Sequence, residues 1–269
     1  MTEGLSHNGP LEGKRIAITR SSEQAAELGA KLEAQGAQVI ILTSIAIRPI
    51  EDTTALDASL RTLDEYDWIV LTSANGVRAV AERMRALGVE WQARRLARIA
   101  VIGPATARAL EETGATPDLL PQHFIAEGIL DDLANVAGQR ILLLRADIAR
   151  KTLADELRLR GAEVDEVAAY RTELAPIPRG AIEEVFVRDH VDAVTFTSPS
   201  TVHGLVRGLR EAGIEPLRAL DRTALCAIGP ITASALREYG LEPTIVADEY
   251  TTVGLVAAMS RHFGAGTLT

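Results

Sequence analysis

The sequence predicts an α/β protein made of two similar doubly wound domains, each a parallel sheet covered by helices on both faces. Short apolar stretches alternate with helical patterns along the chain, which is typical of parallel sheets. The stretch Val-Ile-Gly-Pro-Ala-Thr at 101–106 returns as Ala-Ile-Gly-Pro-Ile-Thr at 227–232, and seven of ten positions agree between 101–110 and 227–236. The length of 269 residues is too great for one ordinary core and suits two domains.

The first section of the chain contains a strand, a helix, a second strand and an extended run, at 15–20, about 23–35, 37–42 and 45–50. Ser21 or Ser22 caps the helix, and Gly36 ends it. Arg20 and Gly36 each have a counterpart 125 residues later, at Arg145 and Gly161. The section therefore returns as a strand at 140–145, a helix through 153–161 and an extended strand at 162–170.

The second section alternates helices and strands before the first section returns. We expect a helix near 56–63, a strand at 68–73, a helix from 73–76 to about 87, the Gly103-Pro104 strand and helix, a short strand around 118–120 and a helix from about 126. Its counterpart runs through 193–198, the Gly229-Pro230 turn, 243–247 and a helix from 251. A period near 125 residues is too long for a solenoid and indicates two similar domains of the doubly wound, flavodoxin-like class.

Composition excludes several classes of protein. The net charge is −9, which argues against non-specific nucleic-acid binding. No apolar run approaches the ~20 residues of a membrane span, and residues 1–10 lack the features of a signal peptide. The single cysteine, Cys226, permits no internal disulfide and predicts a reducing, cytoplasmic location. We expect a monomer, because the sequence has neither a heptad pattern nor a long apolar surface stripe.

The pattern of histidines gives no support to a metal site. The histidines lie far apart and form no i,i+4 pair: His7, His123, His190, His203 and His262. The sequence also lacks the G-x-x-x-x-G-K and G-x-G-x-x-G motifs and a Ser/His/Asp signature. We therefore expect no metal, no nucleotide hydrolysis and no triad chemistry.

Hydroxyls, glycines and arginines follow the predicted parallel strands, at the edge of a sheet where doubly wound proteins bind ligands. Helix N-termini at this edge offer N–H groups to a carboxylate or phosphate, so two Gly-Pro turns suggest one ligand with acid groups on two sides. The predicted ligand-binding residues are Arg20, Ser73, Ala74, Asn75, Gly103, Thr106, Arg145, Ser198, Ser200, Gly229 and Thr232. Simple N-capping, tight strand-helix turns and ordinary surface arginines explain the same residues without a ligand.

Tyr170 is the candidate catalytic residue. It ends an extended apolar segment beside Arg171, and a tyrosyl hydroxyl can donate a proton to a leaving group. The alternative is a tyrosine that packs its ring in the core and keeps its hydroxyl in water.

In their order and spacing, several short motifs resemble those of uroporphyrinogen-III synthases, and the match runs from Lys14 to about His262. The motifs are Ile18-Thr-Arg20, Leu71-Thr-Ser-Ala-Asn-Gly-Val77, Val101-Ile-Gly-Pro-Ala-Thr106, Leu144-Arg145, Ala169-Tyr-Arg-Thr172, Phe196-Thr-Ser-Pro-Ser200, Ala227-Ile-Gly-Pro-Ile-Thr232 and Thr252-Val-Gly-Leu255. The block 124–128 also resembles the family's stretch before a helix. One departure is Ala146, where many members carry a glycine after the arginine.

The resemblance implies a cofactor-independent hydro-lyase of haem biosynthesis that converts hydroxymethylbilane, a linear tetrapyrrole, into uroporphyrinogen III. The substrate loses its hydroxyl as water, closes through a spiro intermediate and emerges with ring D inverted. Tyr170 would assist departure of the hydroxyl, and the predicted ligand-binding residues would hold acetate and propionate groups. A transient hand-over of the substrate from the preceding enzyme of the pathway is a further expectation.

The resemblance also implies how the sections combine. Residues 1–46 with 175–269 would form one domain and 52–166 the other, joined by a two-stranded ladder of 45–51 and 167–174. The first section then folds with the last, although a neighbouring section is closer in sequence.

Two other classes of function fit parts of the pattern. A non-catalytic two-domain sensor would bind a tetrapyrrole or another polyanionic small molecule, such as a phosphorylated sugar, on the same helix N-termini. A sugar-phosphate isomerase or transferase would need a Glu or His base at a strand end, and the sequence places none there convincingly. Formation of the III isomer from hydroxymethylbilane, in place of the spontaneous I isomer, separates the synthase from both.

Overall fold

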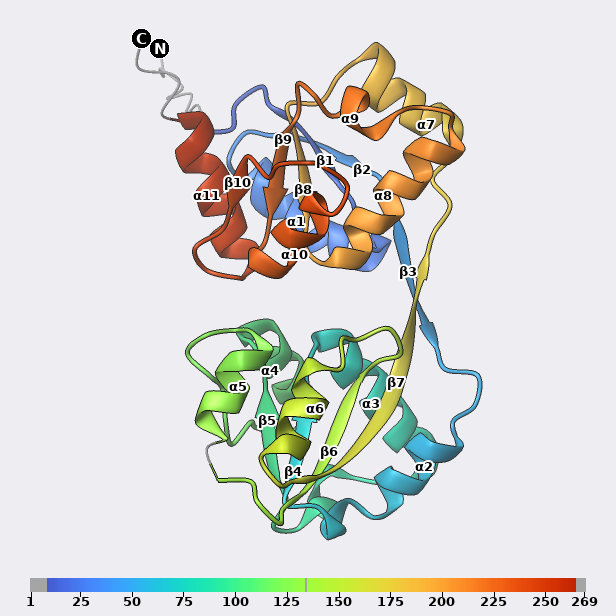
Figure 1. Ribbon diagram of the computed structural model, residues 1–269, viewed down its shortest axis with the longest axis vertical. Helices are drawn as coiled ribbons and strands as arrows, with labels where there is room; N and C mark the ends of the chain where they lie inside the picture. The colour runs from blue at the N-terminus through green and yellow to red at the C-terminus, as the bar shows by residue number, and fades with distance from the viewer. Residues whose placement is uncertain (1–8, 134, 265–269) are drawn as a thin grey trace, which may run out of the picture. The chain divides into compact units, whose positions relative to one another are not determined.

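The computed structural model describes residues 9–133 and 135–264 and divides into two compact units. Unit 1 comprises the chain up to Ala46 and from Glu173 onward, and unit 2 comprises Ile47–Thr172. Each unit is built around one five-stranded sheet (Figure 1).

The sheet of unit 1 has the strand order β10-β9-β8-β1-β2, and each neighbouring pair in it is parallel. The elements of unit 1 are β1 (Arg15–Ile18), α1 (Ser22–Glu33), β2 (Gln38–Ile41), α7 (Arg179–Glu183), the π-turn η3 (Glu184–Arg188), β8 (Ala193–Phe196), α8 (Pro199–Glu211), α9 (Pro216–Ala219), β9 (Ala224–Ala227), α10 (Pro230–Arg237), β10 (Ile245–Val246) and α11 (Thr252–Gly264).

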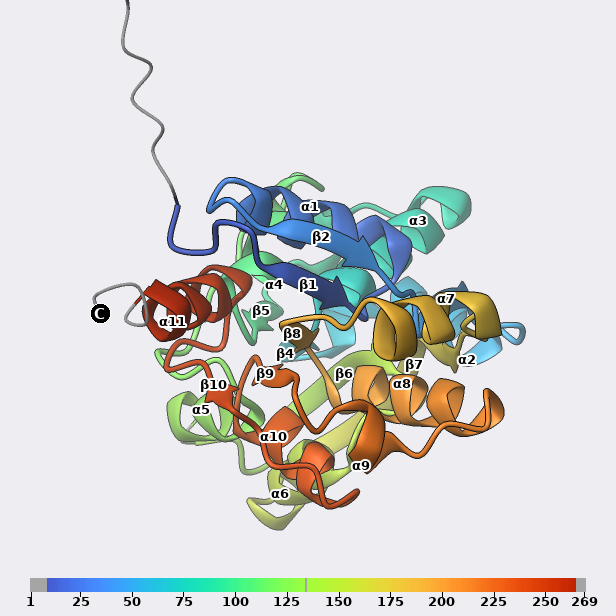
Figure 2. The ribbon, with the colours of Figure 1, turned by 90° about the horizontal axis from the view of Figure 1, so that it is seen from above.

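Helices cover both faces of this sheet (Figure 2). On one face, Leu28 and Leu32 of α1 share a buried cluster with Leu255 and Met259 of α11. On the other face, α8, α10 and the α7 region surround the ring of Phe196 in a second buried cluster. A sheet buried on both faces explains why its strands read as continuous apolar stretches.

Three buried hydroxyl side chains of unit 1 bond to backbone carbonyls near the ends of β1 and β8. Thr19 Oγ1 donates to Thr195 O (2.7 Å), and Thr195 Oγ1 donates to Ala17 O (3.2 Å). Ser44 Oγ lies 2.7 Å from Thr19 O and 3.3 Å from Thr201 O. Thr19, Ser44 and Thr195 are completely buried, so these bonds satisfy hydroxyls that would otherwise be costly.

The sheet of unit 2 has the strand order β3-β7-β6-β4-β5. Its elements are β3 (Ile45–Pro49), α2 (Thr54–Arg61), the 3-10 turn η1 (Leu63–Glu65), β4 (Trp68–Leu71), α3 (Ala74–Leu87), the 3-10 turn η2 (Trp91–Arg94), β5 (Arg98–Val101), α4 (Pro104–Glu111), α5 (Ala126–Asp132), β6 (Arg140–Ala146), α6 (Thr152–Leu159) and β7 (Glu163–Leu174). The β7, β6, β4 and β5 strands run parallel, whereas β3 pairs antiparallel with β7.

Strand β4 lies inside this sheet, between β6 and β5, and shows how both faces are filled. Ile69 and Leu71 point into the cluster formed with α2, α3 and α4, while Trp68 and Val70 point into the cluster formed with α5 and α6. Ile69, Val70 and Leu71 are fully buried, and each such side chain contributes about 1.5–3 kcal/mol through burial.

The predicted fold class is confirmed, including the two-stranded β3–β7 ladder that links the units. The predicted strand at 118–120 is reduced to one parallel bridge between Ala100 and Leu119. The reason is visible at Ile99, whose N–H donates to the Asp118 carboxylate (2.7 Å) and not to a backbone carbonyl. Among the helices described in 9–133 and 135–264, none is long and apolar enough to cross a membrane.

Gly204 of α8 provides a test of the packing in unit 1. A Cβ atom there would lie 2.4 Å from Ser44 O and 2.8 Å from Ser44 Cβ, so Gly204→Ala forces the helix away from Ser44. We expect a loss of about 1–3 kcal/mol in the free energy of unfolding, measured by urea denaturation, even though alanine favours helix. Gly180→Ala in α7 is the control, because nothing lies within 4 Å of its Cβ position, and it should not destabilise. Equal stability of both variants would contradict the close contact.

Candidate active site

The predicted site residues lie at the carboxyl ends of the parallel strands within each unit. In unit 2 these residues are Ser73, Ala74 and Asn75 after β4, Gly103 and Thr106 after β5, Arg145 on β6 and Tyr170 on β7. In unit 1 they are Arg20 after β1, Ser198 and Ser200 after β8, and Gly229 and Thr232 after β9. Each unit thus carries polar groups and helix N-termini at one edge of its sheet.

Ser73 and Tyr170 meet at this edge in unit 2. The Tyr170 hydroxyl lies 3.0 Å from Ser73 Oγ, and Ser73 Oγ accepts a hydrogen bond from Gly76 N (3.0 Å) at the start of α3. Because Ser73 Oγ already accepts from the helix, its own proton or that of Tyr170 completes the pair. A Cβ at Gly76 would lie 3.3 Å from Ser73 Oγ and 3.6 Å from Tyr170 Cε1, so the start of α3 packs closely against this pair.

The environment of Tyr170 keeps its phenol protonated. The side chain is only 7% exposed, and this burial raises its pKa above the ordinary value. The Ser73 hydrogen bond lowers the pKa, and the charge of Asp147 raises it, but both effects are smaller than that of burial. A protonated hydroxyl at a strand end can donate a proton to a departing group.

The two Gly-Pro turns are built alike but do not leave open backbone. Gly103 and Gly229 have extended backbones, so neither requires glycine for its dihedral angles. A Cβ at Gly229 would lie 3.0 Å from the Tyr250 ring, and one at Gly103 would lie 3.5 Å from Phe124 Cβ. An aromatic side chain therefore lies beside each glycine; it crowds the Cβ position at Gly229 and is in ordinary van der Waals contact at Gly103.

Neither Phe124 nor Tyr250 was predicted as a site residue, although Phe124 begins the block 124–128 that resembles the family's. Both are half-buried at the edge that carries the site residues. They are separated by 126 residues, the same spacing as the Gly-Pro turns, and this spacing is the signal that could have found them.

Thr106 and Thr232 follow these turns on the first turns of α4 and α10. They are 5% and 3% exposed, respectively. Among the residues that the structure describes, neither hydroxyl has a hydrogen-bond partner. Their hydroxyls therefore retain their capacity to bond a ligand.

Ser198 and Ser200 lie at the start of α8. Their hydroxyl oxygens are 2.8 Å apart. Thr201 ties the turn together, since its hydroxyl donates to Ser198 O (2.7 Å) and lies 3.4 Å from Ser198 N. The turn is thus held by Thr201, and the two serine hydroxyls form a pair beside it.

The two predicted arginines differ in their surroundings. Arg145 is 3% exposed, and its Nη2 donates to Ala149 O (2.7 Å) and Arg150 O (2.6 Å) and lies 3.2 Å from Glu166. Burial lowers the pKa of the Arg145 guanidinium, and the charge of Glu166 opposes this effect. Arg20 is half-buried and donates from Nε to Gln24 (3.2 Å) in the first turn of α1. Arg145 thus holds a loop of its own unit.

Two other predictions concern capping and metals. Ser21 is the N-cap residue of α1, yet its buried hydroxyl accepts no bond from the helix and has no partner in the described part of the chain. Within residues 9–133 and 135–264, no three His, Cys, Asp or Glu side chains are grouped as metal ligands. Cys226 is fully buried in β9, and burial raises the pKa of its thiol.

Comparison with known proteins gives the same family over most of the chain. The model of the family described as uroporphyrinogen-III synthase HemD matches residues 26–257. A putative uroporphyrinogen-III synthase from Methanothermobacter thermautotrophicus is 34% identical over 254 residues, covering 93% of this chain and 98% of the relative. The uroporphyrinogen-III synthase of Synechococcus elongatus is 34% identical over 257 residues, covering 94% of this chain and 96% of the relative.

Solved structures agree on the fold. A crystal structure of a mutant uroporphyrinogen III synthase from Thermus thermophilus has a TM-score of 0.63 and 23% identity, covering 93% of this chain and 98% of that one. The match of the family model and the two relatives, over a fold with the same two-sheet architecture, settles the assignment. The chain belongs to the uroporphyrinogen-III synthase family.

Proposed function

We propose that this chain cyclises hydroxymethylbilane to uroporphyrinogen III, with loss of water and inversion of ring D, in tetrapyrrole biosynthesis. The family match over most of the chain supports the reaction. The observation that carries the chemistry is the buried, protonated hydroxyl of Tyr170, held beside Ser73 at the carboxyl edge of a sheet.

In this proposal Tyr170 assists departure of the substrate's hydroxyl group. The phenol donates its proton as the carbon–oxygen bond breaks, so the group leaves as water. The electron pair of the pyrrole stabilises the carbon left behind, and the substituted carbon of ring D then attacks it to give a spiro intermediate. The bond between that ring D carbon and its original bridging carbon then breaks, and the bridging carbon bonds to the unsubstituted α-carbon of ring D, which inverts the ring. This α-carbon loses its proton, which restores the phenol and balances the reaction. The remaining acceleration comes from holding the chain ends near each other.

We propose that both units supply donors for the carboxylates of the substrate. A tetrapyrrole with eight carboxylates is repelled by a chain of charge −9 unless donors are concentrated locally. Helix N-termini and hydroxyls at the sheet edges are such donors. The proposed binding residues are Arg20, Ser73, Ala74, Asn75, Gly103, Thr106, Arg145, Ser198, Ser200, Gly229 and Thr232.

We also propose domains at 1–46 with 175–269 and at 52–166, with 45–51 and 167–174 as linker strands. The border residues of the two compact units, Ala46 and Glu173, lie inside the two proposed linkers. A cytoplasmic location and a transient hand-over from the enzyme that makes hydroxymethylbilane complete the proposal. A hand-over would limit the spontaneous closure of free substrate to the I isomer.

The product isomer tests the reaction itself. Purified protein incubated with enzymically generated hydroxymethylbilane should give mainly uroporphyrinogen III, whereas the sample without protein gives the I isomer. The measurement is chromatographic separation of the isomers after oxidation to uroporphyrins. A product mixture identical to that of the protein-free control would overturn the proposed function.

Tyr170→Phe tests the role of the phenol. We expect turnover to fall roughly tenfold, less than the usual 100-fold or more for a general acid, because an electron-rich pyrrole expels its substituent with little help. Product affinity, measured by anaerobic calorimetry, should hardly change, since the ring remains. Burial raises the pKa of Tyr170, so the phenol stays protonated over this range. The ratio of wild-type to Tyr170→Phe turnover should therefore stay constant from pH 7 up to about 10. Unchanged turnover in the variant would remove Tyr170 from the mechanism.

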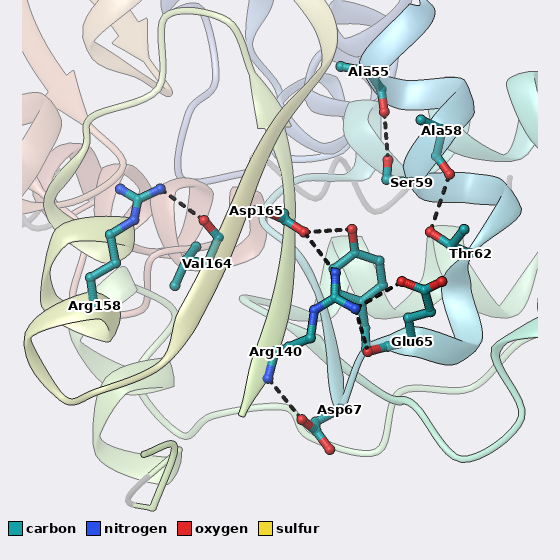
Figure 3. Close-up of polar contacts among 11 residues, drawn as sticks. Ala55, Ala58, Ser59, Thr62, Glu65, Asp67, Arg140, Arg158, Val164 and Asp165 are labelled. Atoms are coloured by element: carbon teal, nitrogen blue, oxygen red, sulfur yellow. Dashed lines mark hydrogen bonds and ion pairs between the residues drawn. The ribbon is translucent and has the colours of Figure 1, made fainter. Parts of the chain in front are cut away.

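Thr232→Ala tests the proposed binding of carboxylates in unit 1. Removal of a buried hydroxyl that bonds a carboxylate should weaken product binding by about 1–3 kcal/mol. Thr62→Ala is a control, because the Thr62 hydroxyl donates to Ala58 O after α2 (Figure 3) and Thr62 is not one of the proposed binding residues. Wild-type affinity in both variants would leave Thr232 with a purely structural role.

A further inference from the structure

Strand β7 keeps a regular alternation of faces along most of its length. Val167 and Ala169 share the buried cluster of α3, whereas Val164 packs against the cluster of α6. Glu166 also lies on the α6 face, where it pairs with Arg158 (3.8 Å). Successive side chains of a strand point to opposite faces, so Tyr170 would be expected on the same face as Val164 and Glu166.

A β-bulge reverses this expectation. Arg145 of β6 lies opposite Ala168, but the next residue, Ala146, lies opposite Tyr170, so Ala169 is an extra residue in β7. Tyr170 consequently shares the α3 cluster with Ala169, and its hydroxyl reaches Ser73 Oγ. A bulge often re-aims a side chain next to an active site, and here it turns the phenol toward the start of α3.

Asp147 holds β7 on the far side of the bulge. Its backbone N–H donates to Tyr170 O (3.0 Å). Its side-chain Oδ1 accepts from Thr172 N (3.0 Å) and from Ile148 N (2.9 Å). The carboxylate therefore takes the place of a backbone carbonyl in the ladder, and a charged acceptor makes the stronger bond. Asp147 thus bonds to the carbonyl of Tyr170 through its N–H and to the N–H of Thr172 through its carboxylate. These two bonds fix the backbone of β7 at Tyr170.

Arg145 keeps Asp147 in place. Its guanidinium binds the carbonyls of Ala149 and Arg150, which closes the loop that begins at Asp147. Because Arg145 is 3% exposed and also lies beside Glu166, this loop is anchored in the interior of unit 2.

We propose that Asp147 is a positioning residue that keeps the bulged part of β7 in the register that directs the Tyr170 hydroxyl to Ser73. This inference rests on the proposed role of Tyr170 in the reaction. Asp147 itself acts through the backbone of β7 and needs no contact with substrate.

The experiment combines two variants of Asp147 with Tyr170→Phe. In Asp147→Ala the bond to Thr172 N is lost, and kcat should fall about five- to tenfold, no further than in Tyr170→Phe, because a displaced phenol is no worse than an absent one. Asp147→Asn keeps an oxygen acceptor for Thr172 and Ile148 and should restore kcat to within about twofold of wild type. KM should change little in either variant, since the substrate contacts are untouched.

The double variant Asp147→Ala with Tyr170→Phe gives the decisive comparison. Positioning through Tyr170 requires that the alanine change lower kcat by less than about twofold in the phenylalanine background. The urea midpoint is measured for the wild type, the two single variants and the double variant. Coupling between Asp147 and Tyr170 should also appear in these midpoints, independently of activity.

Asp165→Ala is the matched control on the same strand. Its carboxylate accepts from the Tyr66 hydroxyl (2.8 Å) and lies 3.6 Å from Arg140, at the amino ends of the strands (Figure 3). This variant should lower stability while leaving kcat unchanged, in either background.

Each result decides between the proposals. A wild-type kcat in Asp147→Ala overturns the positioning role. It is also overturned if Asp147→Ala lowers kcat by the same factor in the Tyr170→Phe background as in the wild type. Equal loss in Asp147→Ala and Asp147→Asn also overturns it, because it would point to the charge and not to the bond. If Tyr170→Phe alone leaves kcat unchanged, the proposed role of the phenol fails, whereas coupling in the urea midpoint still tests the contact with Asp147.

Discussion

Burial of a parallel sheet on both faces is the constraint on which the rest of this structure depends. The middle strands of each unit have apolar side chains above and below, as at Ile69 and Val70, so polar side chains find few places within the core. The completely buried hydroxyls of Thr19, Ser44 and Thr195 in unit 1 are bonded to backbone carbonyls. Polar groups with capacity to bind a ligand therefore collect where the strands end and the helices begin.

The sequence repeat was sufficient to predict these places. Gly103 and Gly229 are related by 126 residues, and both prove to lie between a strand and a helix that begins with proline. The role inferred for the glycines was incomplete, because the Tyr250 ring crowds the Cβ position of Gly229 and the Phe124 side chain lies beside that of Gly103. A glycine in a sequence reports that space is needed, but the residue that uses the space comes from another segment.

Two features could not be predicted, because each depends on pairing between distant segments. Residues 167–170 read Val-Ala-Ala-Tyr, which has no alternation from which an extra residue could be recognised, yet one extra residue decides which face carries the phenol. Arg145 looked equivalent to Arg20, since both follow the first strand of a repeat. The buried Arg145 guanidinium donates to the carbonyls of residues 149 and 150. These carbonyls are available to it because the chain forms a loop, and not a helix, directly after β6.

The loop after β6, where unit 1 has the start of a helix after β1, explains why the two similar units differ at the carboxyl ends of their strands. The interval from Arg20 to Gly36 equals that from Arg145 to Gly161, so no insertion separates the repeats. In unit 1 helix α1 begins at Ser22, whereas in unit 2 helix α6 begins only at Thr152. The residues that would form the first helical turn form a loop, in which Asp147 bonds to β7 and Arg145 binds the carbonyls of residues 149 and 150. Unit 2 thus has a loop in place of about one turn of helix, and this loop holds β7, the strand that carries Tyr170.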